Sequence, residues 1–444
     1  MFSIRHALAT LVAGWIAGIG AAGVYLGVND RAAEAAASLA QVQARYRRPE
    51  TIPFPADNAF SEEKRALGEA LFHDSRLSVD GNLSCASCHE RSLGFADGVA
   101  LTKGVPGRQL KRHTPTLWNL AYGADTFWDG RARTLEEQAT GPITNPDEMA
   151  MPMERLVALL AADPAMTQAF AKAFPADPQV TDLNIARALA TYQRTFVSPQ
   201  TRFDRWVEGE DGALTGQEIA GFALFNGKAG CANCHSGPAF TDSAFHDIGL
   251  PGDDRGRGAV LQLPAADHAF KTPGLRELGR SAPYMHDGSL ATLADVVRHY
   301  QSGIAERDSL SKDLPRGLVL TEEEQQSLVA FLHSLTAETD PELPSRIAPA
   351  LVQSAAPAVR ITTVSQDNKT FHPGRIAVER GARVWIVNND TRTHNVRIFN
   401  PALKFDSGAQ EPGETIQVSF PEAGSFLVFC GLHPKMELRV EVAP

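Results

Sequence analysis

Apolar residues recur three and four positions apart through most of the chain. This spacing predicts helices at residues 61–71, 153–174, 182–196, 215–225, 293–301 and 321–335, with glycine- and proline-rich loops between them. Ser61 before Glu62 and Glu63, and Thr321 three residues before Glu324, are typical of helix starts. Residues 50–337 are therefore expected to form a mainly α-helical body.

Near residue 358 the pattern changes from helical to alternating. Short runs predict strands at residues 359–364, 375–379, 383–388, 395–399, 415–420, 424–429 and 437–442, which together indicate an all-β sandwich over residues 358–444. Just before it, Pro341, Pro344, Pro349 and Pro357 stand among alanine and serine with no long apolar period. Residues 338–357 are therefore expected to be a linker.

The chain begins with an apolar segment. Residues 7–28 carry no charged side chain and follow Arg5 and His6, and as a helix they would span roughly 33 Å, enough to cross a bilayer. No small-residue cleavage site follows the segment, so residues 1–30 are interpreted as an uncleaved signal anchor, a transmembrane helix in the inner membrane. The body then lies in the periplasm, on an alanine-rich helical stalk at residues 31–49. The alternative is a cleaved signal peptide and a soluble periplasmic protein.

Charge excludes some partners. The 444 residues include 42 basic and 52 acidic side chains, a net charge of −10, with no run of lysine or arginine. This balance argues against nucleic acid as a partner. Five cysteines are present, and four of them fall in two short motifs.

The two motifs are Cys-x-x-Cys-His, the attachment signature of c-type haem. They comprise Cys85, Cys88 and His89, and Cys231, Cys234 and His235. In this pattern two thiols bond to the porphyrin and the histidine becomes an iron ligand. A zinc knuckle or a redox dithiol would remain open for one copy, but two copies in register predict two covalently bound haems. Similar sequences around the motifs indicate an internal duplication into two haem domains, at residues 50–205 and 206–337.

The fifth cysteine belongs to a candidate copper site. Cys430, His433 and Met436 follow a predicted strand as Cys-x-x-His-x-x-Met, and His394 lies upstream. Two histidines, one thiolate and a weak axial methionine are the ligands of type 1 (blue) copper. On these residues the domain at 358–444 resembles the cupredoxins, and its short ligand loop is most similar to that of amicyanin.

Several motifs give the helical body a resemblance to the bacterial di-haem cytochrome c peroxidase and MauG family. They read TPTLWN at 114–119, FWDGR at 127–131, KTPGLR at 271–276 and PYMHDGS at 283–289. The resemblance implies that Glu148 is the distal acid–base group, that Gln138 assists it, and that Trp128 relays electrons between the haems. A solvated Glu148 and a structural Trp128 are the alternatives that the residues alone would favour.

The chain departs from the peroxidase pattern at three positions. The loop at residues 104–109 lacks the histidine that caps the first haem in peroxidases needing reductive activation, so that haem is expected to be open. Tyr300 stands where peroxidases have an axial methionine and MauG has tyrosine, although Met285, His286 and His299 remain possible ligands. His113 replaces the asparagine of the family's calcium site. Calcium is therefore doubtful, although Ser281 and Pro283 could still offer carbonyls.

Three functions follow from these predictions. The first is reduction of hydrogen peroxide to water, with electrons passing from an external periplasmic donor, a small cytochrome or cupredoxin, through the fused copper domain and the second haem. The second is a MauG-like, peroxide-dependent oxidation of a residue on a partner protein. The third is electron transfer alone, without a substrate.

Overall fold

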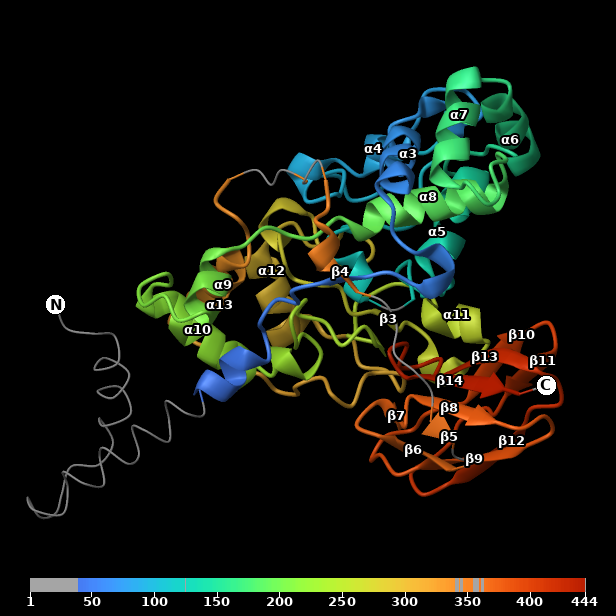
Figure 1. Cartoon of the computed structure of the whole chain (residues 1–444). Helices are drawn as coiled ribbons and strands as arrows, with labels where there is room; N and C mark the ends of the chain where they lie inside the picture. Colours follow the sequence, from blue (N-terminus) through green and yellow to red (C-terminus); the bar gives the residue numbers. More distant parts are fainter. Residues whose placement is uncertain are drawn as a thin grey trace, which may run out of the picture.

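The computed structural model describes residues 39–123, 125–339, 343, 346–353, 359–360 and 363–443. It consists of two helical units and a β domain, which lies against the helical body near α11, Arg257–Leu261 (Figure 1). The predicted membrane helix at residues 1–30 falls outside the described residues. Within the described ranges, no helix combines the length and the apolar character that crossing a bilayer requires.

The first unit carries the first haem motif. Its helices are α3 Glu62–Phe72, α4 Cys85–Cys88, α5 Leu135–Thr144, α6 Met153–Ala161, α7 Pro164–Ala173 and α8 Asp182–Arg194. Ser61 caps α3, since its hydroxyl accepts a hydrogen bond from the backbone N–H of Lys64 (3.2 Å). α3 packs along α8, where Gly68 permits the close approach because a Cβ there would overlap the Ala188 carbonyl.

The second unit repeats this arrangement. Its helices are α9 Arg202–Val207, α10 Gly216–Asn226, α11, α12 Leu293–Arg298, the π-helix η8 His299–Gly303 and α13 Glu322–Ser334. α10 packs along α13, and Gly221 lies against the Ser327 carbonyl as Gly68 does against that of Ala188. A glycine thus permits close packing at the equivalent helix pair of each unit, which supports the predicted duplication.

The predicted stalk at residues 31–49 is described only from residue 39, and that part packs onto the second unit. Leu39 and Val42 contact its apolar core. Tyr46 is 1% exposed and stacks on Phe240, with ring centroids 4.7 Å apart. Residues 39–46 are thus part of the body in this structure. This packing depends on one aromatic side chain, Tyr46, which lies among phenylalanines of the second unit. Helical spacing alone does not indicate such a contact.

The β domain is a sandwich of two sheets. One sheet has the strand order β11–β10–β13–β14–β8–β5 and the other β12–β9–β6–β7. The strands are β5 Val359–Arg360, β6 Thr363–Asp367, β7 Thr370–His372, β8 Arg375–Val378, β9 Arg383–Asn388, β10 Arg397–Asn400, β11 Leu403–Asp406, β12 Thr415–Ser419, β13 Gly424–Phe429 and β14 Glu437–Val442. Alternate residues such as Val384 and Ile386 are buried between the sheets, as the alternating pattern predicts.

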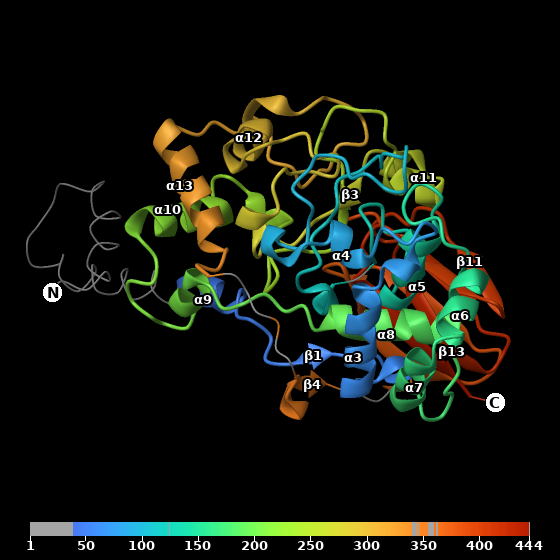
Figure 2. The same ribbon diagram turned by 90° about the horizontal axis from the view of Figure 1, so that it is seen from above.

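Part of the predicted linker at residues 338–357 is ordered against the first unit. β4, Val352–Gln353, pairs in parallel with β1, Ile52–Pro53 (Figure 2). Ile347 is buried, and its backbone N–H donates to the Glu62 carboxylate (2.7 Å). The chain therefore leaves the second unit, returns across the first unit and then enters the β domain.

Candidate haem and copper sites

One cavity of 1160 Å³ joins the two haem motifs. It is lined by all six motif residues, Cys85, Cys88, His89, Cys231, Cys234 and His235. A site for a single small molecule usually measures about 300–1,000 Å³. A continuous cavity of this size, with one attachment motif in each half, fits two large planar groups.

The two motif histidines have the same orientation. His89 Nδ1 lies 2.8 Å from the Phe95 carbonyl, and His235 Nδ1 lies 3.0 Å from the Phe240 carbonyl. Each bond places the proton on Nδ1 and leaves Nε2 as the free ligand atom. Both phenylalanines have positive φ, 59° and 55°, so the same strained turn supplies the acceptor in both units.

The cysteines fit covalent haem better than a redox dithiol. Burial raises the pKa of Cys85 and of Cys231 to about 12, so neither is an activated thiolate. Near Cys234 the structure also gathers Asp242 and His246. The Asp242 carboxylate is already occupied by hydrogen bonds to His246 (2.9 Å) and to the Ala244 backbone (2.9 Å).

Glu148 and Gln138 both line the cavity beside the first haem motif. Burial raises the pKa of Glu148, although Arg131 and a hydrogen bond from Asn145 Nδ2 to Glu148 Oε1 (3.0 Å) oppose the shift. The loop at residues 104–109, which lacks a capping histidine, packs directly on Asp147 and Glu148. Val105 N–H donates to the Glu148 carbonyl (2.8 Å), and Gly104 lies so close to Asp147 that a Cβ would overlap its carbonyl.

Trp128 lies between the two units and also lines the cavity. Its indole Nε1–H donates to the His113 carbonyl (2.8 Å), and its own carbonyl accepts from the Lys271 backbone (2.8 Å). The first unit therefore holds the indole ring, and the second unit holds the backbone of the same residue. His113 is buried, and its Nδ1 lies 2.8 Å from the Val99 carbonyl.

Tyr300 stands in the π-helix η8 and lines the cavity near the second motif. Burial and the neighbouring Cys234 and Cys231 raise its pKa. Of the alternative ligands, Met285 and His286 also line the cavity. His299 does not belong to the lining, because it is buried with its Nε2 3.0 Å from the Ile248 carbonyl.

Three of the four copper ligands predicted from the sequence, His394, Cys430 and His433, converge at one end of the β domain. Nδ1 of His394 and Nδ1 of His433 are 2.9 Å apart, and both lie within 3.8 Å of Cys430 Sγ. Cys430, His394 and Met436 are fully buried. These three converging atoms match the two imidazoles and one thiolate that type 1 copper requires.

Sequence reasoning did not identify Asp390 as an outer partner of this site. Its Oδ2 lies 3.1 Å from His394 Nε2 and fixes the ring so that Nδ1 faces the metal position. An aspartate four residues before the ligand histidine was the only available signal.

Sequence reasoning also missed the contact between the copper loop and the body. Arg257 is 2% exposed, and its guanidinium donates to the carbonyls of Gly431 (2.8 Å), Asp129 (3.1 Å) and Gly130 (2.5 Å) and to the carboxylate of Asp125 (2.9 Å). One buried cation thus binds the residue after Cys430 and the two residues after Trp128. Nothing in the local sequence pattern indicates this long-range contact.

Comparisons with known proteins agree with this geometry. A family model described as di-haem cytochrome c peroxidase matches residues 62–212, and one for copper binding proteins of the plastocyanin/azurin family matches residues 358–443. The chain is 48% identical to the methylamine utilization protein MauG of Methylorubrum extorquens, over 69% of this chain and 88% of that protein. It is 36% identical to the cytochrome c551 peroxidase of Nitrosomonas europaea, over 64% of this chain and 84% of that protein. A solved MauG-like protein associated with microbial copper homeostasis is 30% identical, with a TM-score of 0.61, over 69% of this chain and 97% of that one.

Proposed function

The chain belongs to the di-haem cytochrome c peroxidase and MauG family, with a plastocyanin/azurin-family domain at its C-terminal end, and from this membership we propose a hydrogen peroxide reductase supplied with electrons through its own copper domain. The reaction combines hydrogen peroxide with two electrons and two protons to give two molecules of water. The protein must therefore supply a proton donor near the peroxide and a route for electrons into the body.

Each motif would hold one haem by its two thiols and its histidine, with Tyr300 as the sixth ligand of the second haem. Bound haem supplies the iron chemistry that cleaves the peroxide O–O bond. The proposal includes no calcium, because this chain has His113 where the family's calcium site has an asparagine.

The observation that carries the proposal is the environment of Glu148. Its carboxyl lines the shared cavity beside the first motif, and burial raises its pKa. A carboxyl with a raised pKa retains its proton nearer neutral pH and can donate it to a departing oxygen. Gln138, in the same lining, can hydrogen-bond the peroxide and hold it near Glu148.

Trp128 would connect the two halves of the body. It lies in the wall of the shared cavity and is hydrogen-bonded to backbone from both sides. A fixed aromatic ring between two redox groups suits electron relay. His394, Cys430, His433 and Met436 would hold the copper that provides one-electron transfer at the entry to this route.

The test uses the purified protein with two haems and copper bound. Hydrogen peroxide is added with a reduced small cytochrome or cupredoxin, and we expect two donor molecules oxidised for each peroxide consumed. No donor oxidation by the wild-type protein would refute the peroxidase assignment.

MauG-like oxidation of a residue on a partner protein is the second candidate. It is favoured by Tyr300 in the cavity lining, by the loop at residues 104–109 without a histidine, and by the 48% identity to a methylamine utilization protein MauG. This function predicts peroxide consumption without donor oxidation, together with a covalent mass change in a periplasmic partner. Pure electron transfer instead predicts two six-coordinate, low-spin haems and no reaction with peroxide.

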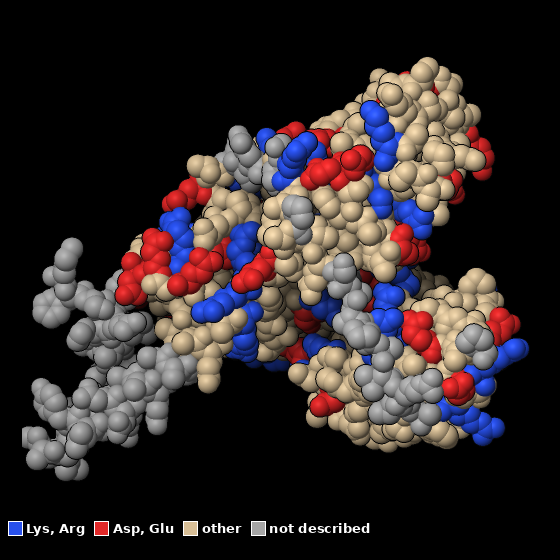
Figure 3. All heavy atoms as spheres, viewed as in Figure 1, with Lys and Arg blue, Asp and Glu red and all other residues tan. Residues whose placement is uncertain are grey.

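The proposed location is the periplasm, at the inner membrane through the N-terminal anchor. Covalent haem attachment and a thiolate copper site both suit an exported protein. Charge gives no reason to propose a nucleic acid partner: on the face in Figure 3, basic and acidic side chains are interspersed among the described residues. Retention of the protein in washed membranes tests the anchor, and release into the periplasmic fraction would instead favour a cleaved signal peptide.

A further inference from the structure

The metal end of the β domain faces the second helical unit. Three residues of the copper-ligand loop bond to that unit through Arg257 Nε to Gly431 O (2.8 Å), Phe245 N to Leu432 O (3.4 Å) and Lys435 Nζ to Thr241 O (3.1 Å). The contact residues Thr241 and Phe245 lie a few positions after the second haem motif. The copper loop is thus seated on the segment that follows His235.

Three ion pairs flank this contact. Lys369 Nζ lies 3.2 Å from Asp242 Oδ2 and 3.7 Å from Asp313 Oδ2, and Arg392 Nη2 lies 2.9 Å from Asp313 Oδ1. The Lys369, Asp242 and Asp313 side chains are only 19%, 11% and 22% exposed. Pairs that are mostly removed from water are screened less by salt than surface pairs.

Lys369 is hydrogen-bonded through both its backbone N–H and its side-chain ammonium group. It sits in the turn between β6 and β7 with φ of 56°, next to Asn368 at 47°, the paired positive values of a tight hairpin turn. Its backbone N–H donates to Asp390 Oδ2 (2.8 Å), the same oxygen that lies against the copper ligand His394. Its ammonium binds Asp242 across the interface.

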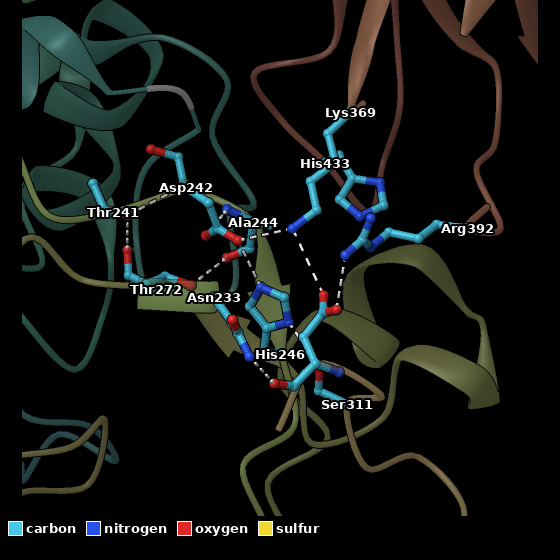
Figure 4. Close-up of polar contacts among 12 residues, drawn as sticks. Asn233, Thr241, Asp242, Ala244, His246, Thr272, Ser311, Lys369, Arg392 and His433 are labelled. Carbon is cyan, nitrogen blue, oxygen red and sulfur yellow. Dashed lines mark hydrogen bonds and ion pairs between the residues drawn. The ribbon is translucent and has the colours of Figure 1, made fainter. Parts of the chain in front are cut away.

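In the second unit, Asp242 is in turn bonded to the second haem motif. The Asp242 backbone N–H donates to the Cys234 carbonyl (2.8 Å), and its carboxylate also binds His246 (2.9 Å). Figure 4 shows Lys369 and His433 on the side of the β domain, with Asp242 and His246 facing them from the second unit. Hydrogen bonds and one ion pair therefore link the copper ligand His394 to the second haem motif through Lys369.

We propose that Lys369 is the positioning residue for electron transfer from copper to the second haem, and that its contacts to Asp242 and Asp313 clamp the copper domain in one fixed orientation. This inference rests on the proposed function, because it assigns the route by which electrons enter the body. The inference means that the copper domain is docked on the second unit and is not only tethered to it by the linker. A tether alone would give an effective concentration of about millimolar and a spread of orientations.

Four proteins test the clamp: the wild type, Lys369→Arg, Lys369→Glu and Arg383→Glu. Lys369→Arg retains the charge, whereas Lys369→Glu places an anion against two aspartates. Arg383→Glu makes the same change of charge at the start of β9. That position is remote from the clamp, because β6 runs parallel to β9 and pairs Gln366, near the clamp, with Asn388 at the other end of β9.

The first measurement is the distance distribution between Cu²⁺ and the low-spin ferric haem in the oxidised holoprotein, by pulsed dipolar electron paramagnetic resonance. We expect one narrow distance in the wild type, Lys369→Arg and Arg383→Glu, and a broad distribution in Lys369→Glu. A narrow, unchanged distance in Lys369→Glu would overturn the clamp. This measurement involves no peroxide and therefore stands even if the proposed function fails.

The second measurement is the return of the blue copper band after copper-reduced protein is mixed with peroxide. We expect Lys369→Glu to slow this step about tenfold or more, because like charges across an interface oppose docking. The response of the haems to peroxide should be unchanged, and Lys369→Arg should react as the wild type does. Equal rates in all four proteins would refute the inference, whereas copper that stays reduced in the wild type would refute the proposed function.

Discussion

Replacing Glu148 with glutamine is the sharpest test of the proton-donor role. Glutamine has the same shape, and its side-chain carbonyl can still accept the hydrogen bond from Asn145 Nδ2. The backbone bond from Val105 N–H to the residue 148 carbonyl does not depend on the side chain. The substitution should therefore preserve the fold of the loop and remove only the transferable proton.

The expected loss follows from the role assigned. General acid–base catalysis contributes about 10²–10⁴-fold, which is roughly 3–5 kcal/mol of activation free energy. We expect Glu148→Gln to lower the rate of peroxide-dependent haem oxidation within that range. Peroxide binding should change less than the rate, because Gln138 remains in the cavity lining.

The pH dependence of activity gives a second prediction, whose direction follows from the pKa of Glu148. Burial raises the pKa of Glu148, and the Asn145 hydrogen bond lowers it. The protonated form is the donor, so wild-type activity should fall as pH rises through this raised pKa. Asn145→Ala removes a bond to the charged form, worth about 1.5–3 kcal/mol, and should move the alkaline limb upward by about one pH unit or more.

The assay is stopped-flow mixing of the holoprotein with peroxide across pH, followed through the haem absorption. Glu154→Gln in α6 is the matched control, since its side chain is exposed and lies outside the cavity lining. If Glu148→Gln retains a third or more of the wild-type rate, the carboxyl is not the proton donor. A downward shift of the alkaline limb in Asn145→Ala would contradict the electrostatic argument.

Three further predictions concern the metal sites and the interface. Cys430→Ser should abolish the blue absorption band and leave both haem spectra unchanged. Arg257→Met leaves the buried Asp125 carboxylate without its ion-pair partner, so denaturant titration should show that the free energy of unfolding falls by about 3–5 kcal/mol. Because burial raises the pKa of Asp125, that loss should grow as pH rises above the ordinary carboxyl range and shrink as pH falls, and a pH-independent loss would contradict the ion pair. Tyr300→Phe should change the spectrum of the second haem, whereas an unchanged spectrum would favour Met285 as its ligand.

The sequence was most informative where chemistry imposes a short covalent pattern. Both haem motifs and the Cys430–Met436 loop could be read directly, because their spacing is set by one porphyrin or one metal ion. Helix positions were less accessible: α8 and α13 lie where the apolar spacing predicts helices, but the predicted helix at 153–174 is two helices, α6 and α7, and α5, α9 and α11 were not predicted. The strands β7 and β11 were missed because each has three or four residues and alternates buried or half-buried with exposed positions only briefly.

Contacts between distant charged residues could not be read from the sequence. Lys369 and Asp242 lie 127 positions apart, and neither stands in a run of charges that would indicate the pairing. Arg257 likewise reaches Gly431 across 174 positions. Such pairs depend on how whole domains dock, and local periodicity carries no information about docking.

The duplication explains how one fold can provide two different haem pockets. Loops of equal length are closed by the bridges Thr126–Ala132 and Tyr284–Leu290, and within them Trp128 occupies the position that His286 occupies in the second unit. The paired helices differ in the same way. Counted from the first residue of α5 and of α12, the eighth position is Pro142 in one and Tyr300 in the other.

Under the proposed function, these two differences in residue type give the two pockets different roles. Because the proline side chain has no ligand atom, we expect the first pocket to stay open beside Glu148, whereas Tyr300 in the π-helix η8 would offer a phenol oxygen to the second. Trp128 supplies an aromatic ring where the second unit has an imidazole stacked on Phe270, at 3.5 Å between ring centroids. The copper domain then docks on the unit whose iron is expected to be closed to peroxide. Under the proposed function, electrons would enter at one pocket and peroxide at the other, so the two would not compete for the same face of the protein.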